Sequence, residues 1–338
     1  MVANWCEEKT VRKHDVMRQL AIHLSSQGPK GHRKRLTINV NGEDLPPLPD
    51  AINAHILSIS TGERFSMNWN DMQASKVEVF VLNFMSEKYV LPRFMQYIEK
   101  LKVLIITNYG YYFSDLENFP PPQYLSSLTR IRLDHVSISS ISTQLLEIVN
   151  LQKLSLIICK IGNSFNEFTD GIPKKLPNIF ELDIESCDDL FTFPKILCTL
   201  VRLRKLSITN CHNLTSLTEE FGGLTNLEVL RLASCSDLKT LPDSIVNLKK
   251  LIIIDISYCI QLSKLPKGMG ELSCLKTIHM TACTGLGLDE ISSTFGESCS
   301  LEVVCDDEIS WLWNHHPTVI KQIVEKDTFG SFSKIVSN

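Results

Sequence analysis

The chain has 338 residues, a formal net charge of −4 and a hydrophobic fraction of 43%. This length allows a large buried core, and the small net charge excludes the bulk basic field that would hold nucleic acid. Neither a secretion signal nor an apolar run approaching the roughly 18 residues of a membrane span is present, so we expect a soluble, unsecreted protein without membrane insertion.

The eleven cysteines give the same indication about compartment. An odd number of cysteines spread over the whole chain favours reduced thiols over an extracellular disulfide framework. The sequence therefore predicts a cytoplasmic or nuclear location.

The N-terminal third contains one helical pattern and several short strands. In VRKHDVMRQLAIHL (residues 11–24), Val16, Leu20 and Leu24 share one helical face, and Asp15 is placed to cap the helix. HILSIS (55–60), KVEVFVLNF (76–84) and LKVLIIT (101–107) resemble short strands. We interpret them as two or three degenerate repeats before Pro120.

A regular repeat follows, and its clearest mark is a cysteine at an interval of 24 residues. One unit reads Leu203-x-x-Leu206-x-Ile208-x-x-Cys211-x-x-Leu214. The repeated cysteines are Cys187, Cys211, Cys235, Cys259 and Cys283. Alternating residues have the period of a strand, and each unit is too small to bury its own apolar face. The pattern predicts an α/β leucine-rich-repeat solenoid, or horseshoe, with a parallel β-ladder on its concave face.

The repeated cysteine is predicted to be structural, with its sulfur packed inward and able to donate to turn carbonyls. A redox or metal role is the alternative, because stacked strands bring successive cysteines within nominal bridging distance. However, their Cβ vectors would run parallel, and the chain has no CxxC pair. The adjacent histidines His315 and His316 lack an acidic or cysteine cluster. We therefore predict no metal site.

Outward strand positions on the concave face are the first candidate partner-binding residues. Val229 and Ile253 would form an apolar centre bordered by polar side chains. The bordering residues are Arg231, Asp255 and His279. The alternative is an ordinary solvated face.

ISWLWNHHPTVIKQIVEK (309–326) carries Trp311 and Trp313 ahead of an expected helix. We interpret this segment as a cap that covers the last repeat. The alternative is that a tryptophan anchors a partner, so both are kept as candidate partner-binding residues.

LPDSIVNLKKLIIIDISYCIQLSKLPKGMGEL (241–272) closely resembles the repeats of plant intracellular nucleotide-binding immune receptors. The resemblance is strongest to helper receptors with a powdery-mildew-resistance-type coiled coil, and it covers roughly residues 10–325. VEVFVLNFMSEKYVLPRFM (77–95) and LSLIICKIGNSF (154–165) resemble segments of this class, and we favour its N-requirement-gene branch.

The resemblance also extends to the winged-helix module of these receptors, through the triplet Lys13, His14 and Asp15. In the family the matching histidine approaches the β-phosphate of ADP, but no GxxxxGK[ST] phosphate loop occurs in this chain. We therefore predict a relic with no cofactor. The stretch MVANWCEEKT departs from the receptor pattern, which favours a naturally short, N-terminally truncated form over an arbitrary cut.

These features predict four parts of the chain. They are a winged-helix remnant (1–42), degenerate N-terminal repeats (43–120), regular repeats (121–300) and a C-terminal cap (301–338).

The resemblance implies a non-enzymatic interaction module in plant innate immunity. Its implied partner is a lipase-like heterodimer of the enhanced-disease-susceptibility family, with the senescence-associated subunit form favoured. By occupying that partner, the chain would act as a competitor, and hence a negative regulator, of full-length helpers. The alternative is a sensing fragment of an active receptor that promotes cell death. An enzymatic function has little support, because we find no nucleophile elbow and no paired carboxylates in an evident pocket.

Overall fold

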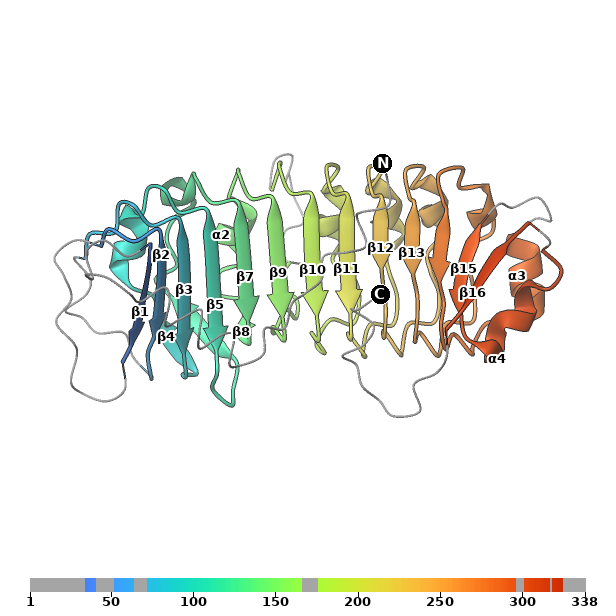
Figure 1. Ribbon diagram of the computed structural model, residues 1–338, viewed down its shortest axis with the longest axis horizontal. Coiled ribbons are helices and arrows are strands. Elements are labelled where there is room, and N and C mark those ends of the chain that lie inside the picture. The colour runs from blue at the N-terminus through green and yellow to red at the C-terminus, as the bar shows by residue number, and fades with distance from the viewer. Residues whose placement is uncertain are drawn as a thin grey trace.

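A single long parallel sheet organises the molecule. The computed structural model describes residues 34–40, 52–63, 72–165, 176–295, 301–316 and 318–324. Figure 1 shows the strands side by side in one row, with the helical turns behind them. In spatial order the strands are β1 (Arg35–Asn39), β2 (Ile56–Ser60), β3 (Val79–Phe84), β5 (Val103–Asn108), β7 (Arg130–Asp134), β9 (Lys153–Ile157), β10 (Glu181–Glu185), β11 (Lys205–Thr209), β12 (Val229–Arg231), β13 (Ile253–Asp255), β14 (Thr277–His279), β15 (Glu302–Cys305) and β16 (Ile320–Ile323). The predicted α/β solenoid with a parallel ladder is confirmed.

The register of the ladder explains the core. Leu206 pairs with Leu230 and Leu230 with Ile254, so one inward position stacks on the same position of the next repeat. Residues on either side of these point to the other face, as the alternating burial of β3, β5 and β11 shows. We call that other side, the predicted concave face, the open face. The core is therefore continuous along the solenoid and shared between neighbouring repeats.

Short turns and a second sheet return the chain between the main strands. The three-stranded parallel sheet contains β4 (Lys88–Val90), β6 (Ser114–Glu117) and β8 (Val136–Ser137). The helical turns are η3 (Arg93–Tyr97), η4 (Pro122–Leu125), α2 (Ser142–Leu146), η5 (Lys195–Thr199), η6 (Glu219–Gly223), η7 (Asp243–Asn247), η8 (Met269–Glu271), α3 (Leu288–Thr294), α4 (Asp307–Ser310) and η9 (Trp311–Trp313). Pro194 and Pro242 directly precede η5 and η7 with an extended backbone. Proline suits this position because its ring fixes φ and it has no N–H to leave unpaired.

The repeated cysteine occupies the predicted structural position. The thiols of Cys235, Cys259 and Cys283 are buried and donate to carbonyl oxygens one repeat earlier, on Ile208, Leu232 and Ile256. The Sγ to oxygen distance is 3.0 Å for Cys259. The cysteines of the described ranges are free thiols. Each thiol thus satisfies a carbonyl at the strand end and links two consecutive repeats.

The residue before each repeated cysteine has a left-handed backbone. Its φ is 56° at Asn210, 61° at Ser234 and 62° at Tyr258. This conformation turns the chain sharply out of the strand, and asparagine is one of the few non-glycine residues that adopt it readily.

At both ends of the described chain, the structure differs from the sequence-based expectation. The helix expected after the tryptophans is wrong, because the chain there forms β16, which pairs in parallel with β15. Val319, Ile320, Ile323 and Val324 are β-branched, and the free edge of β15 offers backbone partners to an extended segment. At the other end, β1 pairs with β2, although residues 35–39 fall in the range assigned to the winged-helix remnant.

No helix in the described part of the chain is long and apolar enough to cross a membrane.

The thiol environment leads to a labelling prediction. Burial raises the pKa of the Cys211 and Cys283 thiols to about 12, so almost no thiolate is present at pH 8. We expect iodoacetamide to modify exposed Cys274 in the native protein and to reach Cys211 and Cys283 only after unfolding. Peptide mass spectrometry of native and guanidinium-treated samples measures this. Native modification of Cys283 comparable to that of Cys274 would contradict the structural role.

Candidate interaction surface

The sequence-predicted partner-binding positions lie together on β12, β13 and β14. Val229 is in register with Ile253, and both side chains are partly exposed. Arg231 is in register with Asp255, which in turn faces His279. The structure therefore brings these residues into one patch of the open face, with the aliphatic pair beside the polar row.

Charge in this patch is largely paired. The guanidinium Nε of Arg231 lies 3.3 Å from the Oδ2 atom of Asp255. The other carboxylate oxygen of Asp255 accepts the backbone N–H of Ser257 at 3.1 Å. Asp255 is thus held in place, whereas Arg231 remains exposed and keeps donors available for a partner.

Lys153 forms the most enclosed ion pairs on the open face. Its Nζ atom lies 2.8 Å from Glu181 and 3.0 Å from Asp183, both on the neighbouring strand. Burial lowers the pKa of the Lys153 ammonium, but the two carboxylates outweigh burial and leave that pKa above its usual value. This cluster joins β9 to β10, directly beside the strand β7 that carries Arg130 and Arg132.

The two tryptophans have different environments. Trp313 is 1% exposed, packs 5.1 Å from the Phe295 ring and donates its indole N–H to the sulfur of Met280. Trp311 is 50% exposed and donates its indole N–H to the carbonyl of Glu308. Only Trp311 therefore offers an aromatic surface to a partner. Lys13, His14 and Asp15 lie outside the described residues.

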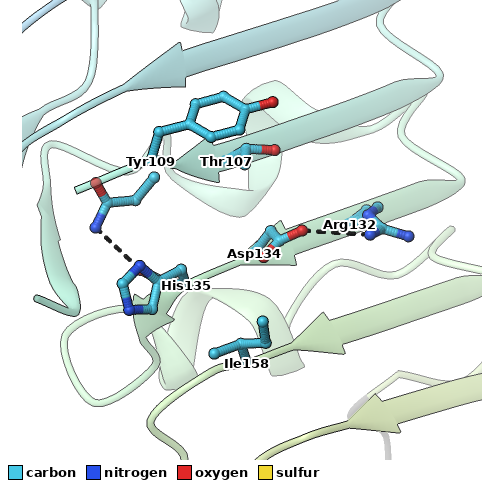
Figure 2. Close-up of a pocket in the computed structure, with 7 residues that line it drawn as sticks. Thr107, Tyr109, Arg132, Asp134, His135 and Ile158 are labelled. Carbon is cyan, nitrogen blue, oxygen red and sulfur yellow. Dashed lines mark hydrogen bonds and ion pairs between the residues drawn. The ribbon is translucent and has the colours of Figure 1, made fainter. Parts of the chain in front are cut away.

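A second site, which the sequence analysis did not identify, lies at the carboxyl ends of β5, β7 and β9. It is an open hollow of about 430 Å³. Figure 2 shows Tyr109, Asp134, His135 and Ile158 around it, with Arg132 paired to Asp134. The lining residues are Thr107, Asn108, Tyr109, Arg132, Asp134, His135 and Ile158. The hollow combines an aromatic ring, a guanidinium and an aliphatic wall.

A run of aromatic residues begins at Tyr109, in the wall of this hollow. We call residues 109–113 the tyrosine loop; Tyr109, Tyr112 and Phe113 in it are exposed, and Tyr111 is 99% exposed. Buried Asn108 holds the loop: its amide donates to the carbonyls of Tyr112 at 2.7 Å and His135 at 3.2 Å. The sequence signal that could have identified this site is the run NYGYYF directly after a strand, because aromatic residues replace the small polar residues usual in such a turn.

Sequence comparisons agree with the repeat architecture. The chain matches the family model described as a leucine-rich repeat region over residues 179–297. The "Probable disease resistance protein At4g33300" of Arabidopsis thaliana is 40% identical over 198 residues, which is 57% of this chain and 24% of that protein. The "Probable disease resistance protein At5g66890" of Arabidopsis thaliana is 36% identical over 223 residues, 64% of this chain and 54% of that protein.

The chain has a leucine-rich-repeat fold and is similar in sequence to disease-resistance proteins of Arabidopsis thaliana. It spans about a quarter of the first relative's length and about half of the second's. Among solved structures, the leucine-rich repeat domain of the type III effector XCV3220 (XopL) is similar, with a TM-score of 0.40 and 19% sequence identity over 80% of this chain and 84% of that chain.

The Lys153 cluster generates a stability prediction. We expect Lys153→Met to lower the free energy of unfolding by about 1–2 kcal/mol at pH 7, because it leaves Glu181 and Asp183 without their cation. The raised pKa of Lys153 means that the folded protein holds the ammonium proton more tightly than the unfolded chain does. The stabilisation is therefore present at neutral pH and lost as the pH rises above about 10.4.

Arg130→Met provides the matched control, since Arg130 forms no ion pair within the described ranges. Urea unfolding followed by circular dichroism compares the two variants. Equal losses of stability from both would show that the ion pairs of Lys153 contribute nothing.

Proposed function

We propose that the chain is a non-enzymatic interaction module of plant immunity that binds a lipase-like heterodimer of the enhanced-disease-susceptibility family. The form with the senescence-associated subunit is favoured. The observation that supports this most is the patch on β12–β14, where Val229 and Ile253 are partly exposed beside Arg231 and Asp255. A partly apolar centre with a charged border is the arrangement typical of protein interfaces.

Relationship to disease-resistance proteins supports a role in immunity, and the resemblance to helper receptors supplies the choice of partner. We propose that the chain acts in the cytoplasm, the nucleus or both. A chain that binds this heterodimer without driving the downstream response would reduce, by mass action, the amount available to full-length helpers. The chain would then be a negative regulator.

The geometry also favours binding over chemistry. Burial raises the pKa of eight cysteine thiols in the described ranges, namely Cys159, Cys187, Cys198, Cys211, Cys235, Cys259, Cys283 and Cys305. Such thiols are poor nucleophiles at neutral pH. Within the described ranges, no group of three or more His, Cys, Asp or Glu side chains is placed to hold a metal ion.

The test is displacement of a full-length helper from the purified heterodimer. We expect the chain to bind and displace the helper, and the double variant Val229→Asp with Ile253→Asp to bind at least about tenfold more weakly. The matched control is Val149→Asp with Val201→Asp, which changes two exposed valines in turns before β9 and β11. Thermal unfolding confirms that both variants fold.

Binding without displacement at saturating concentration would exclude competition. Co-expression with a helper in plant tissue separates the two directions of regulation. Reduced cell death supports the competitor, whereas increased cell death supports a fragment that promotes signalling.

A further inference from the structure

The open face near the N-terminal end of the ladder has a distinct chemistry. Four outward positions on β3 and β5 are aliphatic, with Val79 in register with Val103 and Val81 with Ile105. All four side chains are partly exposed. Apolar side chains on adjacent strands form a continuous patch, since neighbouring strands lie about 4.8 Å apart.

The next strand, β7, adds positive charge along the edge of this patch. Arg130 is exposed, in register with Val103, and forms no ion pair within the described ranges. Arg132 is in register with Ile105 and contacts only Asp134 among the carboxylates of these ranges, at 3.3 Å. Two guanidinium groups therefore border the aliphatic patch with donors left for an outside carboxylate.

The tyrosine loop extends beyond the end of β5, next to this edge (Figure 1). Its backbone is fixed because Asn108 also accepts the N–H groups of Gly110 at 2.9 Å and Ser86 at 3.3 Å. Exposed tyrosines on a pre-ordered loop lose little conformational entropy when a partner binds. Tyrosine is also enriched among the residues that contribute most to protein interfaces.

Packing does not explain why an isoleucine stands at position 158. It is 44% exposed, and its φ is 49°, a left-handed value that is unfavourable for a β-branched residue. The equivalent position in the β11 repeat is Asn210, which tolerates this backbone. Ile158 forms part of the wall of the hollow. The repeat imposes this left-handed turn before every repeated cysteine, so the feature that sets position 158 apart is its β-branched side chain. Strain that is retained at an exposed position is typical of functional sites.

We propose that this region docks an extended acidic segment of a partner protein. We define the tyrosine-loop face as the four aliphatic positions on β3 and β5, the two arginines of β7, the tyrosine loop and Ile158. Aliphatic side chains of the segment lie on β3 and β5, and its carboxylates pair with Arg130 and Arg132. One larger apolar side chain enters the hollow between Tyr109 and Ile158.

The size and charge of the face indicate this kind of partner. A hollow of about 430 Å³ accommodates one or two side chains, and the flat patch beside it suits an extended chain. The outward positions of β3 and β5 carry no charge, and the two arginines of β7 outnumber Asp134, so the face is cationic overall. Nucleic acid fits less well, because the face offers only two guanidinium groups beside an aliphatic patch, whereas a phosphate backbone carries a charge at every nucleotide.

The tyrosine-loop face is separate from the patch on β12–β14, so its test does not depend on the heterodimer. A display library of short random peptides is panned against the purified full chain, with single-stranded oligonucleotides assayed in parallel. We expect enrichment of peptides that place Asp or Glu next to aliphatic or aromatic residues. Absence of enrichment, enrichment of basic peptides, or oligonucleotide binding lost on Tyr111→Ala would overturn the proposal.

Three variants locate the site. Tyr111→Ala and the double change Arg130→Glu with Arg132→Glu should each lower the affinity for the enriched peptides about tenfold or more. Val229→Asp with Ile253→Asp, on the distant patch, should leave their affinity unchanged. If the β12–β14 variant abolishes peptide binding and Tyr111→Ala does not, the tyrosine-loop face is not the site.

Ile158→Asn separates binding from folding. Because asparagine relieves the left-handed strain, this variant should raise the midpoint of thermal unfolding while it weakens peptide binding. A purely structural role for Ile158 predicts unchanged peptide affinity, and that result would remove Ile158 from the proposed site. A more stable protein with weaker binding cannot be attributed to misfolding.

Discussion

Stacking of inward aliphatic side chains between neighbouring repeats is the constraint on which the structure depends. Leu206, Leu230 and Ile254 occupy one position of the frame on consecutive strands, and each is buried only because the next repeat covers it. A single unit has too little apolar surface to fold alone. The repeated thiol adds a directional contact to this packing, since Cys259 donates to the carbonyl of Leu232 in the preceding repeat.

This division between core and open face explains what the sequence could predict. Inward positions recur with the repeat, so the strands, their register and the structural role of the cysteine follow from periodicity. The sequence predicts a helix where β16 forms, because this segment lies beyond the last repeat and the repeat period gives no information about its conformation. There, the free edge of β15 decides the conformation of Ile320–Ile323 by offering backbone partners.

The candidate sites were predictable only in part, for a related reason. Val229 and Ile253 stand out because their column is otherwise mostly polar. The tyrosine loop has no counterpart in the repeat frame, and its exposure depends on Asn108, whose four hydrogen bonds join segments far apart in sequence. The strain at Ile158 is equally hard to predict, because the residue type alone does not reveal the backbone angle φ. Its position directly before Cys159 is nevertheless a clue, since none of the five later repeats places a β-branched residue there.

Electrostatics make the two surfaces independent of each other. Strand β7, with its two arginines, lies four strand steps from β12, which corresponds to about 19 Å. Exposed charges are largely screened beyond about 8 Å at physiological ionic strength. Between them, Lys153 neutralises much of the charge of Glu181 and Asp183 across β9 and β10. A charge changed on one surface therefore has little effect on the other, so a solenoid with one continuous core can carry two binding sites whose specificities vary separately.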